Sequence, residues 1–277
     1  MRSTEPGPGL SMALPPFEGA VRLLALLLGG IFLLQFALFF AADPADPTSW
    51  HEALTRFARL DPEAWRAGVP EVWQLFTYGL LHAVQDPLHL LGNLLILWFF
   101  GSMLQADMDP RRFALFWFAC QVAGGLVFLL PAAFGFDSPS AIGASGAAYG
   151  VMAACATLHP DARVLLIIVP LRLRTLVLIV LGLTIFAALL DFKQGSSGVA
   201  HLVHLGGLAA GHGLVRSGAW RFDPWALLAR RRAVAEIERG ADDEARMDRL
   251  LEKIHREGIG SLTRSEKAFL ERMSSRR

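Results

Sequence analysis

Three groups of polar side chains interrupt stretches of the sequence that are otherwise apolar enough to cross a membrane. They are His82 with His89 and Asn93, Ser145 with Tyr149, and His201 with His204. A polar group in hydrocarbon is costly unless it is satisfied, so ionisable residues in such stretches are functional candidates. A serine hydroxyl beside a neutral imidazole can perform nucleophilic catalysis, because the imidazole takes the hydroxyl proton as the oxygen attacks a carbonyl and then returns it to the leaving amine.

Helical periodicity predicts that the serine and one of the histidines meet. Ser145 and Tyr149 lie about 40° apart on a helix and therefore share a face. His204 lies on the same stripe as Gly207 and Gly211, where the backbone of a neighbouring helix can come closest. The helix that carries Ser145 offers a matching stripe of small residues: Gly146, Gly150 and Ala154. Packing the two stripes together would bring His204 toward Ser145.

We expect a catalytic dyad rather than a triad. Asp137 and Asp191 fall at the edges of loops, so no carboxylate is expected at the right depth to orient the histidine ring. We predict instead that Tyr149 stacks on His204 and holds the ring in place.

Donors for a tetrahedral oxyanion can also be named. Asn93 has an amide NH₂ group and His89 an imidazole N–H, and the two share a helix face, being four residues apart. The backbone N–H of Ser145 can add a third donor. Gly143 would let the loop turn tightly into the helix, and Gly146 would leave room for a substrate backbone beside the nucleophile.

Each group also has a structural interpretation. A glycine-flanked serine in an apolar helix often bonds back to its own backbone. His89 and Asn93 could be a buried hydrogen-bonded pair, and the spacing of His201 and His204 permits a metal pair. These interpretations are weaker together than separately, because all three groups fall at one depth. We expect neither a metal nor a cofactor.

Composition points to a polytopic membrane protein. Of the 277 residues, 53% are hydrophobic and only 18% are charged, which is a low charged fraction for a soluble domain. The net charge is +1, so the overall charge indicates no nucleic-acid partner. Cys120 and Cys155 both fall in apolar spans and are interpreted as small core residues.

The fold class expected is an all-α membrane bundle of six transmembrane helices followed by a small helical hairpin. The predicted domains are a cytoplasmic N-terminal tail at 1–20, a membrane domain at 21–217 and a cytoplasmic tail at 218–277. The first apolar run is interpreted as an uncleaved transmembrane helix rather than a signal peptide. The six predicted spans cover residues 21–42, 88–106, 112–134, 141–159, 174–191 and 199–216.

Arginines in the short loops predict the orientation. They cluster after the second, fourth and sixth spans, whereas the 3–4 loop has none and the 5–6 loop holds only Lys193. Both termini are therefore predicted to be cytoplasmic, in a membrane that we expect to be the bacterial inner membrane. Ser145 is then expected about one turn into span four from the outer face.

The connecting segments have their own patterns. Between spans one and two, residues 43–87 read as an interfacial segment with an aromatic-anchored helix; the residues at helical spacing are Trp50, Leu54, Phe57 and Leu60. Residues 164–171 are too short to span a membrane and contain Pro170, so we expect an interfacial connector.

The soluble tail reads as two helices. The first has an apolar stripe at Met247, Leu250, Leu251 and Ile254 and is expected to stop at Gly258. Residues 263–266 form a capping box, which starts a second helix with Phe269, Leu270 and Met273 inside it. Such a hairpin is marginal alone, so we expect it to dock on the membrane domain or on a partner.

Taken together, the motifs resemble the rhomboid family of intramembrane serine proteases. The resemblance covers roughly residues 70–216 and rests on "HLLGN" at 89–93, "GASG" at 143–146, Tyr149, and "HLGGLAAG" at 204–211. It implies a six-helix bundle with a water-filled cavity open to the outer face, which hydrolyses peptide bonds in or near transmembrane segments of other membrane proteins. It also implies Ser145 as the nucleophile, His204 as the base, and His89, Asn93 and the Ser145 N–H as oxyanion donors.

Some features depart from the family or leave alternatives open. The family's Trp-Arg pair is Trp73-Gln74 here, and the glutamate common after span two is absent from "GSMLQADMD". His201 competes for the role of base, although only His204 has the family's spacing to the glycines. Two other functions remain: a rhomboid-like pseudoprotease that binds membrane clients, and a metal-ion or proton transporter that uses the histidines. The sequence indicates no particular substrate and no oligomeric state.

Overall fold

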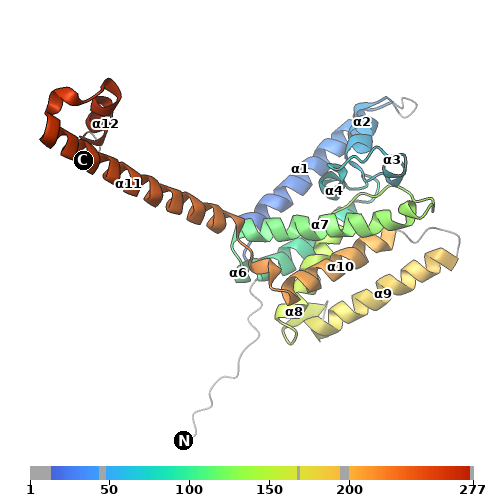
Figure 1. The fold of residues 1–277 in the computed structure, drawn as a ribbon. Helices are drawn as coiled ribbons and strands as arrows, with labels where there is room; N and C mark the ends of the chain where they lie inside the picture. Colours follow the sequence, from blue (N-terminus) through green and yellow to red (C-terminus); the bar gives the residue numbers. More distant parts are fainter. Residues whose placement is uncertain (1–13, 44–47, 167–168, 194–199, 275–277) are drawn as a thin grey trace, which may run out of the picture. The chain divides into compact units, whose positions relative to one another are not determined.

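A computed structural model describes residues 14–43, 48–166, 169–193 and 200–274, in two compact units that divide between Phe222 and Asp223 (Figure 1). Residues 1–13 of the predicted N-terminal tail, the predicted first residue of span six at 199, and the final three residues lie outside the described part. The first unit is a bundle of apolar helices, and the second is a long helix that turns back into a short one.

In the described part of the first unit, eight helical segments form its bundle. They are α1 (Gly19–Ala41), α5 (Pro87–Ile96), a π-helical turn (Leu97–Gly101), α6 (Ser102–Asp107), α7 (Pro110–Ala133), α8 (Ser145–Leu158), α9 (Leu173–Lys193) and α10 (Ala200–Arg216). Among the described residues, four helical segments are long and apolar enough to cross a membrane: α1, the continuous run from α5 to α6, α7 and α9. α8 is a shorter apolar helix of 14 residues.

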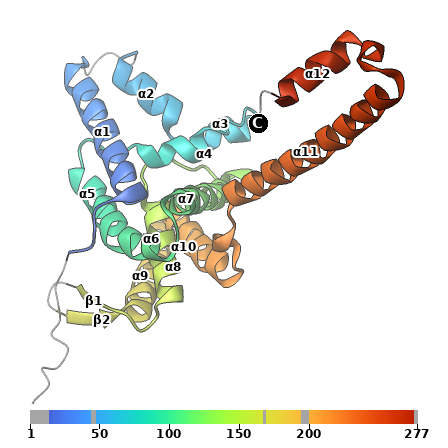
Figure 2. The ribbon, with the colours of Figure 1, turned by 90° about the vertical axis from the view of Figure 1, so that its left-hand side faces the viewer.

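α8 lies at the centre of the bundle. Its residues from Ser145 to Cys155 are all buried except Tyr149, and most of them are small. It packs against both α7 and α10, and the two views of the ribbon show these three helices together (Figures 1 and 2). A helix with so many small residues cannot fill much space itself, so its neighbours come close to its backbone.

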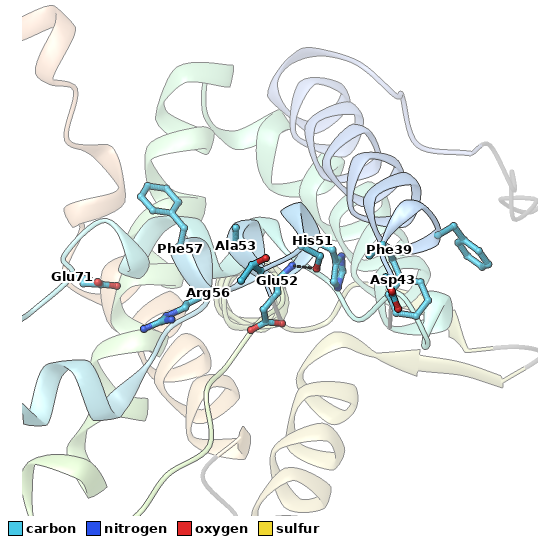
Figure 3. Close-up of a pocket in the computed structure, with 12 residues that line it drawn as sticks. Phe39, Asp43, His51, Glu52, Ala53, Arg56, Phe57 and Glu71 are labelled. Carbon is cyan, nitrogen blue, oxygen red and sulfur yellow. Dashed lines mark hydrogen bonds between the residues drawn. The ribbon is translucent and has the colours of Figure 1, made fainter. Parts of the chain in front are cut away.

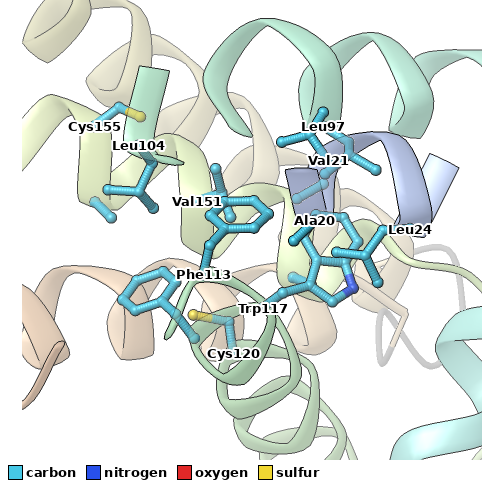
Figure 4. Close-up of a cluster of buried hydrophobic side chains, with 14 of the residues drawn as sticks. Ala20, Val21, Leu24, Leu97, Leu104, Phe113, Trp117, Cys120, Val151 and Cys155 are labelled. Carbon is cyan, nitrogen blue, oxygen red and sulfur yellow. The ribbon is translucent and has the colours of Figure 1, made fainter. Parts of the chain in front are cut away.

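Larger side chains fill the space between α7 and the rest of the bundle. Phe113, Trp117 and Cys120 of α7 are almost fully buried and contact residues of α1 and α8, such as Leu24 and Val151 (Figure 4). The outer surfaces of α1 and α9 are instead apolar and exposed, with Leu33 at 67% and Leu178 at 65% of full exposure. Exposed apolar surface on this scale fits contact with lipid.

The segment between α1 and α5 folds into short helices: α2 (Trp50–Ala58), α3 (Pro62–Arg66), α4 (Gln74–Thr77) and a 3₁₀ turn (Tyr78–Leu80). The expectation that Leu60 continues the helical stripe of Trp50 is wrong. Arg59 is extended, and Asp61 precedes Pro62, which disfavours a helical conformation at residue 61. Leu60 is fully buried and forms an isolated β-bridge with Ala141 instead.

The segment expected to be an interfacial connector contains two short antiparallel strands. β1 (Arg163–Leu166) pairs with β2 (Val169–Arg172), and Arg163 lies opposite Arg172 (Figure 2). Residues 167–168 lie outside the described part.

The second unit contains α11 (Pro224–Glu257), a 3₁₀ turn (Ile259–Ser261) and α12 (Arg264–Ser274). α11 ends at Glu257 and is followed by Gly258, as predicted, with a φ of 80°. The capping box forms: Thr263 Oγ1 accepts from the Glu266 N–H, and Glu266 Oε2 accepts from the Thr263 N–H at 2.7 Å. The small core consists of Leu250, Leu262 and Phe269, with Met247, Ile254, Leu270 and Met273 packed against it. Leu251 was expected in the apolar stripe but is 53% exposed.

Candidate active site

α8 begins at Ser145 itself. The sequence had placed Ser145 one turn inside a span that starts at 141, and that expectation is wrong. Ala141 is held in the bridge to Leu60, and Gly143 has a φ of 120°, a conformation that a side chain would strain. The serine therefore lies where the loop enters the helix. Its N–H belongs to the first turn, in which backbone N–H groups have no partner within the helix.

Ser145 and His204 are in direct contact. The distance between Ser145 Oγ and His204 Nε2 is 2.8 Å, although the residues are 59 positions apart in the chain. For Nε2 to accept the hydroxyl proton, the neutral ring must carry its own proton on Nδ1. The ring of Tyr149 is stacked on that of His204, with centroids 4.3 Å apart and planes inclined by 13°. His204 is thus in contact with the hydroxyl and with an aromatic face.

Close helix packing makes this contact possible. A Cβ atom added to Gly207 would collide with the carbonyl oxygen of Gly146, and one added to Gly211 would collide with that of Gly150. The obstructing atoms are backbone, so no side-chain rotation could relieve the overlap. The glycines therefore let α10 approach α8 closely enough for an imidazole to reach a serine hydroxyl.

Asn93 and His89 lie beside the loop that precedes the nucleophile. Asn93 is buried, and its amide nitrogen is 3.0 Å from Nε2 of His82. The rings of His82 and His89 meet edge to face at 5.2 Å, and a Cβ atom on Gly143 would come within 2.8 Å of His89 Cε1. In the described part of the chain, no hydrogen bond joins Asn93 or His89 to Ser145.

Gln121 is hydrogen-bonded to the same loop and is not among the site residues predicted from the sequence. Its Nε2 donates to the Gly143 carbonyl and its Oε1 accepts from the Ala147 N–H, both at 3.1 Å. The hydroxyl of Tyr78 donates to the Gln121 carbonyl at 2.7 Å. A lone glutamine in an apolar span was the available signal, because a buried amide in hydrocarbon must find partners.

The two carboxylates considered for a triad contact other residues. Asp191, in the last turn of α9, pairs with His201 at 3.2 Å. Asp137 is exposed and pairs with Arg66 at 3.1 Å. The His201 ring centroid is 6.0 Å from that of His204, so Asp191 reaches the neighbour of the candidate base rather than the base.

The large cavity near the end of α1 is separate from these residues. It has a volume of about 1250 Å³ and is lined by residues of α1 and α2, among them Phe39, His51 and Arg56 (Figure 3). None of the candidate catalytic residues lines it. The contacts of the serine and histidine, not cavity size, identify the candidate site.

Comparison with known proteins identifies the family of the chain. The family model of the rhomboid domain matches residues 69–218. The chain belongs to the rhomboid family. With its apolar helices, this rhomboid protein is a multi-pass integral membrane protein.

Two further similarities extend the comparison. The rhomboid protease GluP of Bacillus subtilis (strain 168) is 29% identical over 196 residues, which are 68% of this chain and 35% of that protein. The rhomboid chain thus spans about a third of the length of this curated relative. Residues 238–276 match a family of unknown function (DUF6576).

Proposed function

We propose that this rhomboid protein is an intramembrane serine endopeptidase, which hydrolyses peptide bonds in or near transmembrane segments of other membrane proteins. The observation that carries the proposal is the 2.8 Å hydrogen bond between Ser145 Oγ and His204 Nε2. Membership of the rhomboid family and the similarity to a rhomboid protease support it.

In the proposed mechanism, Ser145 and His204 act as a dyad. Ser145 Oγ attacks the scissile carbonyl carbon as its proton moves to His204 Nε2. The C–N bond then breaks, the proton passes to the leaving amine, and an acyl-enzyme ester remains on Ser145. Water attacks that ester with His204 again as base, which releases the carboxylate product and restores the hydroxyl.

The negative charge on the carbonyl oxygen needs donors that are already in place. The N–H of Ser145 is available because it begins α8. The amide of Asn93 carries two N–H donors, of which the contact to His82 uses one. His89 lies against Gly143, two residues before the nucleophile, and would supply the third donor.

The proposed reaction limits the kind of substrate, and the loop arginines indicate the orientation of the protein in the membrane. Hydrolysis requires water and an extended chain at the scissile bond, whereas a helix shields its peptide groups. Substrates should therefore carry helix-breaking residues near one end of their span and small residues at the cut. The arginines of the short loops support an orientation with both termini cytoplasmic, which puts Ser145 near the outer face.

The test is cleavage of a single-span protein with a glycine-containing membrane segment, with both proteins reconstituted in liposomes. The wild type should release two fragments whose masses add up to the substrate plus one water, and Ser145→Ala should release none. Equal cleavage by Ser145→Ala would overturn the proposal. A folded wild type that binds such proteins without cutting any would favour the client-binding alternative, and proton or zinc flux that survives Ser145→Ala would favour the transporter.

A further inference from the structure

A chain of buried polar contacts runs from α1 to the loop that carries the nucleophile. Gln35 of α1 is 1% exposed, and its side-chain oxygen accepts a hydrogen bond from the backbone N–H of His82 at 3.1 Å. His82 is fully buried, and its ring contacts Asn93 and the backbone of Ala144. The contacts thus join three segments that are far apart in the sequence.

The ring of His82 must act as a hydrogen-bond acceptor here. The Ala144 N–H, which can only donate, points to Nε2 at 3.4 Å. This contact assigns Nε2 as unprotonated and places the proton of the neutral ring on Nδ1, a buried atom that has no hydrogen-bond partner among the described residues. The amide nitrogen of Asn93 must then donate to the same Nε2, at 3.0 Å. One acceptor thereby sets the rotation of the Asn93 amide and the direction of the peptide group between Gly143 and Ala144, in the loop just before Ser145.

Gln35 is the hydrogen-bond partner of the His82 backbone. α1 is otherwise apolar between Leu23 and Ala41, and an amide buried in such a helix is costly unless it is hydrogen-bonded. Residues 81–86 are not helical, so the N–H of His82 has no helical partner and Gln35 supplies the acceptor. The backbone carbonyl of Gln35 accepts in turn from His51 Nδ1 at 3.3 Å, next to Phe39 (Figure 3).

We propose that His82 is a positioning residue that orients Asn93 and the Ala144 peptide for stabilisation of the oxyanion, and that Gln35 holds His82 from α1. This inference rests on the proposed function, because it assigns the orientation of a donor used in that reaction. Without the acceptor, the Asn93 amide can rotate away from the substrate oxygen and the turn into α8 loses one of its supports.

A matched pair of substitutions separates the acceptor from the bulk of the ring. His82→Gln has a side-chain oxygen that can reach the position of Nε2, whereas His82→Met has similar length without a comparable acceptor. Both are compared with wild type in liposomes for kcat and KM on the single-span substrate. His82→Met should lower kcat about tenfold, less than the 10²–10³-fold typical of losing an oxyanion donor, with KM within about twofold. His82→Gln should restore most of the lost activity.

The same substitutions in an Asn93→Ala background show whether His82 acts through Asn93. There, His82→Met should reduce kcat by less than about threefold, since the Asn93 donor is already gone and only the contact with Ala144 remains to be lost. The proposal is overturned if His82→Met keeps full kcat, if it costs the same with and without Asn93, or if a folded His82→Gln recovers nothing. If His82→Met does not fold, Gln35→Met is measured in its place. Gln35→Met should lower kcat about threefold, and an unchanged kcat would contradict the proposal.

Ser145→Ala is included in each experiment to separate this inference from the proposed function. Cleavage by Ser145→Ala would refute the serine mechanism itself. An inactive Ser145→Ala together with a fully active His82→Met would refute the positioning role alone.

Discussion

The imidazole of His204 is held between two neighbours of different chemistry. Its Nε2 contacts the hydroxyl of Ser145, and its face stacks on Tyr149. A third neighbour, His201, is 6.0 Å away and is paired with Asp191. These contacts favour His204 as the base and give His201 a different local role.

Substitution of the two histidines should separate their roles. His204→Ala should lower kcat by about 10²–10⁴-fold, the range typical of removing general acid–base catalysis. His201→Ala should keep most of the activity, since its ring does not contact Ser145 among the described residues. Initial rates on a single-span substrate, with thermal unfolding as the folding control, measure both effects. A larger loss with His201→Ala than with His204→Ala would reverse the assignment.

The stacked ring offers a second comparison at this scale. Tyr149→Phe preserves the aromatic face, whereas Tyr149→Leu removes it. Aromatic pairs are worth about 0.5–1.5 kcal/mol, so Tyr149→Leu should reduce kcat/KM by about two- to tenfold relative to Tyr149→Phe. Equal values for the two variants would mean that stacking does not orient His204.

At the scale of elements, the contact between α8 and α10 decides whether the site exists. Their glycines bring two helix backbones together, and α7 packs against both helices. The site therefore depends on residues that take no part in the chemistry.

Two glycines on α10 test this dependence. Gly207→Ala places a methyl group against the Gly146 carbonyl and should destabilise the bundle by about 1–3 kcal/mol or more, the usual cost of overpacking. Gly213 lies on the same helix, and a Cβ atom added there would meet no atom within 4 Å. Gly213→Ala should therefore leave the stability of the bundle unchanged or raise it slightly. Thermal unfolding in detergent compares them, and equal midpoints would show that α8 and α10 do not need this close contact.

Sequence periodicity predicted which residues share a helix face, because a regular helix fixes the angle between successive side chains. The small-residue stripes indicated which helices pack closely, and the all-α membrane fold is as predicted. Contacts made through irregular segments were not predictable. His82 reaches Asn93 and Ala144 from a non-helical stretch, and Leu60 pairs with Ala141 after α2 has ended at Ala58. No periodicity connects such residues, so only coordinates reveal them.

At the scale of the whole molecule, the chain combines a bundle that carries the candidate site with a helical unit that has its own small core. In the second unit, the backbone N–H of Thr263 and the ammonium of Lys253 hold the pKa of Glu266 down, from 4.5 to about 2. A lowered carboxyl pKa in the folded state adds stability above the unfolded pKa of about 4.5, and this stability is lost as the pH falls toward 2.

This linkage predicts a pH dependence that one substitution removes. Glu266→Gln should lower the hydrogen-exchange protection factors of the α12 amides at pH 7 and flatten their decline between about pH 5 and pH 2. Glu271→Gln, on the same helix and exposed, should behave as the wild type. The two variants are measured in the full-length protein, and an unaltered pH profile in Glu266→Gln would exclude the capping box as its cause.

The central claim is that Ser145 is a nucleophile activated by His204. Mass spectrometry after reaction with a fluorophosphonate tests it most directly, because the probe forms a stable ester with an activated serine and releases fluoride. We predict an adduct on Ser145 in the wild type, none in Ser145→Ala and a strongly reduced rate of labelling in His204→Ala. No adduct on Ser145 in the folded wild type, or equally fast labelling of Ser145 in His204→Ala, would contradict the account.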